Sequence, residues 1–257
     1  MPTRQTDVIL APCQQTDLDV VILAGGLGTR LRSVLPRLPK VLAPVNGRPF
    51  ITYLLDHIAS CGLRRVTFCL GYRASDVIEA LGDRYGPLTL AYSVEESPLD
   101  TAGAVRNAAG CLRSDPVLVL NGDSLSAVRL DAFVDWFLAG GHEVGLALTY
   151  QDDCSRFGGV VLGDGDRIVS FEEKSATSRP GWINAGIYLL RRGALLSIPP
   201  GGPQSFERQF FPQRLSLGLH GFRTQGAFID IGTPASLLEA GGFCDAATAG
   251  NPSRNLP

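Results

Sequence analysis

The residues between Val20 and Lys40 combine the features of a phosphate-binding site. A short apolar run breaks into a loop with glycines at positions 25, 26 and 28, and two basic residues follow, Arg30 and Lys40. Glycine lets the backbone turn tightly and lets an anion approach the backbone amides. An arginine and a lysine nearby would neutralise the charge of a phosphate. The spacing therefore predicts a phosphate site in the loop that follows a buried strand.

Two common phosphate loops do not fit this spacing. A dinucleotide-binding loop, G-x-G-x-x-G, counted from Gly26 would need its third glycine where Leu31 stands. A P-loop needs a Gly-Lys pair, which the chain lacks. The glycine spacing thus excludes a dinucleotide-dependent oxidoreductase, and it also excludes a P-loop.

Two aspartates have the setting of metal ligands. Asp123 follows the apolar run 117–120, and Asp230 lies between an apolar run and a glycine turn. Mg²⁺ is usually held by one or two carboxylates together with phosphate oxygens of the substrate. The alternatives are a turn residue at Asp123 and a helix-entry cap at Asp230.

The chain strongly favours arginine over lysine. Of its 23 basic residues, 21 are arginine and two are lysine. Both lysines, Lys40 and Lys174, fall inside candidate site motifs. Arginine presents a broad fork of donors, whereas lysine presents a compact charge. We therefore interpret the two lysines as positions that need the compact charge.

Hydrophobic patterning places these residues on an α/β core. Val20 to Ala24 is predicted to form a buried strand. Further strands are predicted at residues 66–70, 88–94, 117–120 and 144–150. Helices are predicted at residues 50–61, 75–81, 101–112 and 130–138. This alternation implies a Rossmann-like, mostly parallel sheet with helices on both faces, which binds its ligands at the carboxyl ends of the strands.

The pattern changes after residue 150 to a small antiparallel insert. Residues 159–162 and 167–171 flank a Gly-Asp-Gly-Asp turn and predict a β-hairpin. Asp164-Gly165-Asp166 resembles the metal motif of many glycosyltransferases, but turn chemistry explains it better. The remaining predicted elements are strands at 183–191, 220–224 and 227–230, a helix from a Ser205 cap to Leu217, and a helix capped by Thr233.

Length and charge indicate one α/β domain. In a chain of 257 residues we expect a flexible leader over 1–18, a single domain over 19–243 and a flexible tail over 244–257. A net charge of −2 without a basic stripe argues against nucleic acid as a partner. No apolar run is long enough to span a membrane, and the N-terminus lacks the features of a secretory signal.

Cysteines and histidines form no metal or catalytic pattern. The six cysteines are scattered without a C-x-x-C pair, so we expect mostly buried free thiols and a cytoplasmic protein. His57, His142 and His220 show no mutual spacing, and we expect no catalytic role for them. A homo-oligomer is left open, because nothing in the sequence reports on assembly.

The loop and the two aspartates resemble a known family. The string Gly26-Leu27-Gly28-Thr29-Arg30, followed after eight residues by Pro39-Lys40, is similar to the signature of the sugar-1-phosphate nucleotidyltransferases. The resemblance covers about residues 19 to 240 and includes the segments 157–160, 171–174 and 183–188. It implies a GT-A-like fold and in-line attack of a sugar 1-phosphate on the α-phosphorus of a nucleoside triphosphate. It further implies catalytic roles for Arg30 and Lys40, and Mg²⁺ on Asp123 and Asp230.

The resemblance also implies two sets of binding residues. The expected nucleotide-binding residues are Leu23, Ala24, Gly25, Gly26, Gly28, Thr29, Glu95, Asp100, Thr101, Ala102, Asn121 and Gly122. The expected sugar-phosphate residues are Gly158, Glu173 and Asn184 for the hydroxyls and Lys174 for the phosphate. The alternative for Glu173 is a solvated strand end.

The resemblance implies that Glu95 contacts the base, because it stands where thymidylyl-transferring relatives carry Gln. A carboxylate only accepts hydrogen bonds, and guanine offers two adjacent donors, so Glu95 favours GTP over another triphosphate. The alternative is a solvated acid before a turn. Relatives usually carry Gly where Asp100 stands. Because some uridylyltransferases also carry an acid there, uracil stays open.

The whole pattern is most similar to the D-glycero-α-D-manno-heptose 1-phosphate guanylyltransferases. Heptose as the sugar follows from this resemblance alone, and mannose 1-phosphate or another sugar 1-phosphate stays open. A glycosyltransferase would lack the Gly-Thr-Arg…Pro-Lys segment. A non-catalytic homologue should have lost Arg30, Lys40, Asp123 or Asp230, and all four are present.

Overall fold

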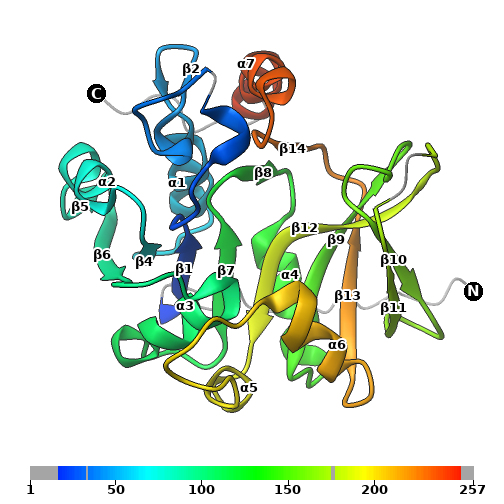
Figure 1. Ribbon diagram of the computed structural model, residues 1–257. Coiled ribbons are helices and arrows are strands. Elements are labelled where there is room, and N and C mark those ends of the chain that lie inside the picture. The colour runs from blue at the N-terminus through cyan, green and yellow to red at the C-terminus, as the bar shows by residue number, and fades with distance from the viewer. Residues whose placement is uncertain (1–16, 33, 175–176, 250–257) are drawn as a thin grey trace, which may run out of the picture.

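Four parallel strands form the centre of the sheet (Figure 1). The computed structural model describes residues 17–32, 34–174 and 177–249. β1 (Asp19–Leu23) lies between β4 (Arg65–Leu70) and β7 (Val117–Asn121), parallel to both, and β6 (Leu88–Val94) follows β4. All four strands were predicted, and the α/β class with a mostly parallel core is confirmed.

The second half of the chain adds antiparallel strands to the same sheet. β12 (Gly181–Leu190) pairs antiparallel with β7 and with β9 (Val144–Gln151), and β13 (Leu219–Thr224) runs parallel to β9. The predicted hairpin is present as β10 (Gly159–Leu162) and β11 (Ile168–Glu172), which joins the sheet through β12. The antiparallel insert is therefore continuous with the parallel core.

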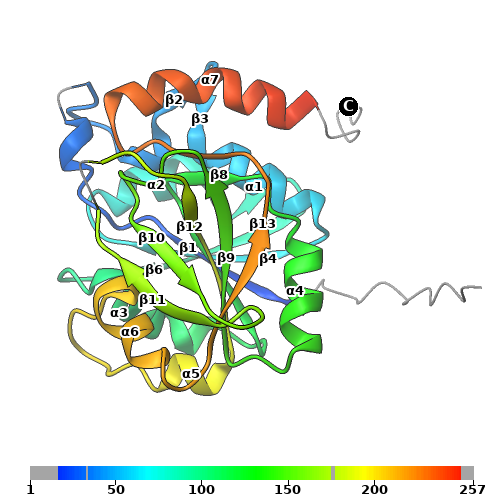
Figure 2. The same ribbon diagram turned by 90° about the vertical axis from the view of Figure 1, so that its right-hand side faces the viewer.

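Helices cover both faces of this sheet (Figure 2). Successive residues of a strand point to opposite faces. Val20 and Ile22 accordingly pack in one apolar cluster, and Val21 packs in the other. The first face is covered by α1 (Phe50–Ser60), α2 (Ala74–Leu81) and α4 (Leu130–Ala139). The second face is covered by α3 (Asp100–Ala108), α5 (Arg192–Leu196), the π-helical turn Phe206–Phe210 and α6 (Phe211–Arg214).

Several short elements have no hydrophobic periodicity, and most of them could not be predicted from the sequence. They are β2 (Pro44–Val45), β3 (Arg48–Pro49), β5 (Arg84–Tyr85), β8 (Ser124–Ser126) and the 3-10 turns Thr29–Leu31, Lys40–Leu42 and Ala109–Cys111. β8 pairs antiparallel with the predicted strand β14 (Phe228–Asp230), apart from the main sheet. This small sheet turns out to assemble the site.

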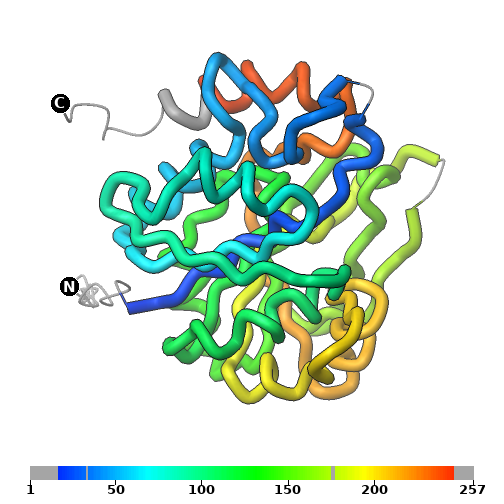
Figure 3. The backbone as a smooth tube through the Cα atoms, turned by 60° about the vertical axis from the view of Figure 1, so that its left-hand side comes forward, coloured from blue at the N-terminus to red at the C-terminus, as the bar shows by residue number. Residues whose placement is uncertain are grey.

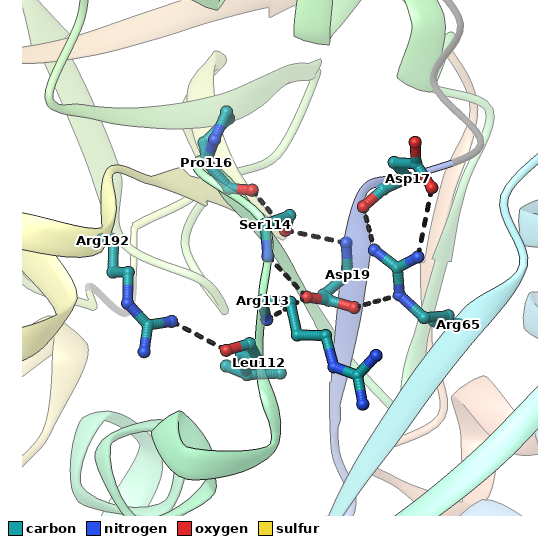
Figure 4. A network of polar contacts seen from close by, with 8 residues as sticks. All are labelled: Asp17, Asp19, Arg65, Leu112, Arg113, Ser114, Pro116 and Arg192. Atoms are coloured by element: carbon teal, nitrogen blue, oxygen red, sulfur yellow. Dashed lines mark hydrogen bonds and ion pairs between the residues drawn. The ribbon is translucent and has the colours of Figure 1, made fainter.

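A buried aspartate anchors the amino end of β1 (Figure 4). Asp19 accepts a hydrogen bond from Arg65 Nε at 2.6 Å and further bonds from the amides of Arg113 and Ser114. Burial by itself would raise the pKa of Asp19, but these hydrogen bonds outweigh it and lower the pKa. The strand that leads into the glycine loop is therefore fixed at its opposite end.

Helix α7 extends past the predicted end of the domain. Helix α7 runs over Pro234–Ala249, beyond the expected end at 243, and Cys244 is fully buried. Figure 3 shows α7 beside the segment that follows β1, where Asn46 Nδ2 donates to Gly241 O at 3.0 Å. The helix continues because it packs there. At the other end Leu18 is buried in the core, whereas residues 1–16 and 250–257 lie outside the described residues.

The Asp-Gly-Asp turn has a structural role. Asp166 accepts hydrogen bonds from Trp136 Nε1 and from Arg223, both at 3.1 Å, so its carboxylate is already occupied. Across the described residues no group of three or more His, Cys, Asp or Glu side chains is arranged to hold a metal. Cys61, Cys69, Cys111 and Cys154 are free thiols, as predicted. No helix in this part of the chain is long and apolar enough to cross a membrane.

Two histidines that the sequence did not connect stack on each other. The rings of His142 and His220 lie 4.1 Å apart, and His220 Nδ1 is buried without a hydrogen-bond partner among the described residues. Burial lowers the pKa of both histidines. His220 lowers the pKa of His142 further, and Arg167 lowers the pKa of His220 further. The folded protein therefore favours neutral rings.

This pair predicts that acid destabilises the fold. The unfolded chain takes up the two protons near pH 6.5 and the folded chain only at lower pH. The stabilisation from the two neutral histidines is thus complete above about pH 6.5, and it is lost as the pH falls through their pKa values in the folded protein. Urea unfolding between pH 8 and 5 should show this loss, and a His142→Gln/His220→Gln variant should show a shallower one. Equal slopes would contradict the prediction. Burial also lowers the pKa of His57, so this residue contributes the same pH dependence to the parent protein and to the variant.

Candidate active site

The glycine loop leaves the carboxyl end of β1 between two neighbouring strands. Ala24 N donates to Cys69 O, and Gly122 N donates to Leu23 O, both at 2.9 Å. Gly28 then takes a φ of 57°, which L side chains adopt at a cost, and starts the turn Thr29–Leu31. The loop therefore needs glycine at this position, and its path is set by the ends of β4 and β7.

A cavity of about 170 Å³ lies against this loop. It is lined by Leu23, Ala24, Gly26, Gly28, Thr29, Arg30, Lys40, Val41, Asp123 and Gly232. The structure thus brings the loop glycines Gly26 and Gly28, both predicted catalytic cations and one predicted metal ligand to the same place. A site with backbone amides, an arginine and a lysine is suited to a phosphate group.

The second predicted metal ligand reaches this place through the sheet that the sequence analysis missed. β8 begins directly after Asp123, and its Ser124 pairs with Asp230 at the end of β14. Ile231 N donates to Asp123 O at 3.0 Å, which locks the two segments together. The carboxylates of Asp123 and Asp230 therefore face one point although they are far apart in sequence.

One ammonium group lies between these carboxylates. Lys40 Nζ is 2.5 Å from Asp123 Oδ2 and 3.9 Å from Asp230 Oδ2, and its side chain is only 13% exposed. The other oxygen of Asp230 accepts a hydrogen bond from Gly232 N at 2.8 Å. Two carboxylates that share a cation fit a hard metal ion such as Mg²⁺, which would complete its shell with substrate oxygens and water.

A larger cavity, of about 730 Å³, adjoins the first one and shares Leu23, Gly26 and Asp123 with it. It contains five further predicted nucleotide-binding residues, Gly25, Glu95, Asp100, Thr101 and Asn121. It also contains residues that the sequence analysis did not select, among them Cys69, Gly71, Tyr72, Ser97 and Pro203. Cys69 lies in β4, and the others follow the ends of β4 and β6 or lie in loops, where no periodic pattern marks a ligand contact.

Glu95 lines this cavity just after β6. Its Oε2 accepts a hydrogen bond from Leu99 N at 3.1 Å. Its Oε1 lies so close to Gly71 that a Cβ there would be 2.6 Å away, so glycine leaves the carboxylate its room. Burial raises the pKa of Glu95, and the charge of Asp100 raises it further, while the Leu99 hydrogen bond opposes the rise.

Two predicted nucleotide-binding residues line neither cavity. Ala102 is fully buried, and its amide donates to Gln204 O at 2.8 Å. Gly122 lies so near β1 that a Cβ would be 2.8 Å from Leu23 O. Both positions therefore have packing roles that the resemblance had not indicated.

The predicted sugar-phosphate residues line neither of these cavities. Asn184 lies where the register of β12 shifts, and its side chain donates to Tyr188 O–H at 3.0 Å and accepts from Gly186 N at 2.9 Å. Burial raises the pKa of Tyr188, whose hydroxyl also contacts Asn121 of the larger cavity. Gly158, with a φ of 81°, lies against the backbone of Glu172. Asn184 is thus connected to the larger cavity through Tyr188.

Glu173 and Lys174 are exposed at the end of β11. The charge of Lys174 interacts with that of Glu207. Glu207 was not predicted as a site residue, because in the sequence it is an ordinary acid in a first helical turn. Loss of hydration raises the pKa of Glu207, the positive charge of Lys174 opposes this rise, and the negative charges of Asp100 and Asp123 add to it. The two sides of the site therefore share one electrostatic environment.

Fold and site together define a class of protein: an α/β protein with a glycine loop, a lysine, an arginine and two carboxylates at the carboxyl ends of parallel strands, a setting suited to a phosphorylated ligand. Sequence comparison specifies it further. The chain belongs to the nucleotidyl transferase family, whose profile matches residues 19–246. The resemblance inferred from the glycine loop is confirmed.

Individual relatives agree with this family. Mannose-1-phosphate guanylyltransferase of Mycobacterium tuberculosis is 36% identical over 86% of the chain, which spans 63% of that relative's length. D-glycero-alpha-D-manno-heptose 1-phosphate guanylyltransferase of Aneurinibacillus thermoaerophilus is 33% identical, over 87% of the chain and 96% of the relative. The crystal structure of HddC from Yersinia pseudotuberculosis complexed with GMP-PN superposes with a TM-score of 0.79 at 30% identity, over 88% of this chain and 99% of that one.

Proposed function

We propose that this chain is a sugar-1-phosphate guanylyltransferase, which transfers GMP from GTP to a sugar 1-phosphate and releases pyrophosphate. The observation that carries the proposal is the position of Lys40 between Asp123 and Asp230, at the junction of the two cavities. The names of the two relatives and the guanine nucleotide analogue in the similar crystal structure support the guanylyl group.

The proposed reaction needs charge neutralisation rather than a general base. The attacking oxygen of the sugar 1-phosphate is already an anion, so the obstacle is repulsion between anions and charge on the leaving group. Arg30 and Lys40 supply positive charge at the phosphates, and the amides of residues 25–28 hold the triphosphate. Mg²⁺, when bound to Asp123 and Asp230, supplies further positive charge to the phosphate oxygens.

Glu95 is the proposed reader of the base. Its carboxylate accepts hydrogen bonds, which matches the adjacent N1–H and N2–H₂ donors of guanine. Uracil and thymine offer one donor at the corresponding edge and would leave one lone pair unmatched. Asp100, by contrast, turns its carboxylate away to Thr101 N and Arg208.

Replacing Glu95 by glutamine tests this role. The amide would place a donor against guanine, so we expect kcat/KM for GTP to fall roughly tenfold to hundredfold, as for a lost hydrogen bond to a charged group. The preference for GTP over UTP should shrink by the same factor. In the parent protein KM for GTP should also rise as the pH falls through the raised pKa of Glu95, and the variant should lack this limb. Glu79→Gln, on the exposed surface of α2, is the matched control. An unchanged base preference would refute the assignment.

For the sugar we propose D-glycero-α-D-manno-heptose 1-phosphate, with mannose 1-phosphate as the alternative. The two share the manno ring configuration and differ in the chain beyond C5, so a pocket that reads the ring accepts both. The Aneurinibacillus relative carries the heptose name and the mycobacterial one the mannose name, at similar identity.

Pyrophosphate release decides the proposal. Both sugar phosphates should be tested with Mg²⁺ and each of GTP, UTP, dTTP, CTP and ATP. Activity with GTP alone would support the guanylyl assignment, and the ratio of kcat/KM for heptose and mannose phosphates would identify the sugar. Activity with UTP would support nucleotidyl transfer but contradict guanine as the base. If no pyrophosphate is released with any pair, or with glucose and muramic-acid phosphates, the result would favour a non-catalytic homologue.

A further inference from the structure

The backbone of Asp100 is in an unusual conformation at the edge of the nucleotide cavity. Asp100 opens helix α3 with a φ of 58°, a left-handed value that costs energy for a residue with a Cβ. Its carboxylate is held on both sides. Oδ1 accepts a hydrogen bond from Thr101 N at 2.8 Å, and Oδ2 pairs with the guanidinium of Arg208. The strained turn is therefore fixed by a partner from a distant part of the chain.

Arg208 belongs to a segment that lies along this turn. We call residues 203–208 the strap. Gln204 O accepts hydrogen bonds from Ala102 N at 2.8 Å and Gly103 N at 3.0 Å, and Gln204 N donates to Leu99 O at 2.8 Å. Phe206 N donates to Thr101 Oγ1 at 2.9 Å. A Cβ on Gly103 would be 2.8 Å from Gly202 O, which shows how close the two backbones are. Several hydrogen bonds therefore join the turn to the strap.

The strap also reaches the other side of the site. Pro203 lines the nucleotide cavity. Phe206 packs on Tyr188 with ring centroids 5.3 Å apart, and the Tyr188 hydroxyl holds Asn184. Glu207 is close enough to Lys174 for the lysine to stabilise its charge. The strap thus runs from the turn beside the base to the residues expected at the sugar phosphate.

We propose that Asp100 and Arg208 are positioning residues that couple the two substrate sites, so that a nucleotide bound against the turn orders the strap for the sugar phosphate. The inference rests on the proposed function for the identity of the second ligand. Neither side chain needs to touch a reacting atom. With the pair removed, the turn keeps its backbone hydrogen bonds to the strap but loses the contact that holds the left-handed residue in place.

The test is a double-mutant cycle on binding. Asp100→Asn keeps the hydrogen bond to Thr101 N and a side chain that tolerates left-handed angles, while Arg208→Gln removes the guanidinium. The dissociation constant of mannose 1-phosphate or the heptose phosphate would be measured by calorimetry with and without the α,β-methylene analogue of GTP, which is not cleaved at the reacting bond. We expect the analogue to tighten sugar-phosphate binding, and each variant to reduce this tightening about two- to fivefold, the scale of an exposed ion pair. The double variant should be no worse than either single one.

Two further variants separate coupling from simple damage. Asp100→Gly relieves the strain and removes the ion pair, so the GTP analogue should no longer tighten sugar-phosphate binding in this variant. Full coupling in Asp100→Gly would overturn the proposal. Arg208→Lys should restore part of the coupling, and Arg84→Gln, on exposed β5, should leave it unchanged. Additive effects of the two single variants would also overturn it.

Hydrogen exchange supplies a readout that needs no sugar phosphate. In the parent protein the GTP analogue should slow exchange at the amides of Gln204 and Phe206, and Asp100→Asn or Arg208→Gln should reduce this protection. If no sugar phosphate binds to any form, the proposed function fails, and the exchange data still decide the coupling. Equal protection in parent and variants would overturn the coupling while leaving the proposed function intact.

Discussion

Asp123→Asn is expected to lower kcat by at least about a thousandfold, the effect of losing several kcal/mol of charge stabilisation at the phosphates. The two side chains have the same shape, so the change removes a negative charge and a strong ligand oxygen. Asp123 lies opposite Asp230, and Lys40 Nζ is 2.5 Å from it. The loss should therefore appear in turnover and in metal binding together.

Three measurements check this prediction. Pyrophosphate release gives kcat, Mn²⁺ titration followed by electron paramagnetic resonance gives metal affinity in the presence of GTP, and circular dichroism reports the fold. Asp164→Asn is the matched control, because Asp164 is an exposed aspartate in the hairpin turn. A folded Asp123→Asn protein with normal kcat would remove Asp123 from the site. A large loss in the control would instead revive the Asp-Gly-Asp motif as a metal site.

Lys40→Arg should lower kcat roughly a hundredfold although it keeps the positive charge. The Lys40 side chain is only 13% exposed, and its ammonium fits between two carboxylates. A guanidinium is broader and cannot occupy the same point without displacing one of them. A misplacement of about 1 Å at a reacting centre costs on the order of a hundredfold, and Lys40→Met should cost a hundredfold to a thousandfold by removing the charge.

Metal binding separates the role of Lys40 from that of Asp123. Both Lys40 variants keep the two carboxylates, so Mn²⁺ should still bind them, whereas Asp123→Asn should lose the ion. Arg129→Lys, the opposite exchange at a surface ion pair whose arginine is exposed, is the control and should leave kcat unchanged. Full activity of Lys40→Arg would show that the site needs only a positive charge. It would also remove the argument drawn from the rarity of lysine in this chain.

The periodic elements could be predicted because their signal is local. The strands β1 and β4 are buried parallel strands, and such strands appear as short apolar, β-branched runs. Glycine 28 was predicted to turn the backbone, and its φ of 57° bears this out. The hairpin at 159–172 followed from two alternating runs around a turn.

Other features depend on packing that no local pattern reports. Helix α7 continues past the predicted boundary at 243, against the segment after β1, where Asn46 contacts Gly241. Ala102 and Gly122, both predicted to bind the nucleotide, pack against neighbouring backbone. The sequence also gave no sign that His142 and His220 stack.

By itself the sequence determined the strand and helix types, the glycine loop, and the presence of Arg30, Lys40, Asp123 and Asp230, since each depends on neighbouring residues. Tertiary structure alone decided that Lys40 meets Asp123, 83 positions away, and that Asp100 meets Arg208, 108 positions away. Such contacts depend on the order of strands in the sheet and on the register of β8 with β14. Local periodicity carries no information about either, because it reports which face of an element is buried and not which distant element covers it.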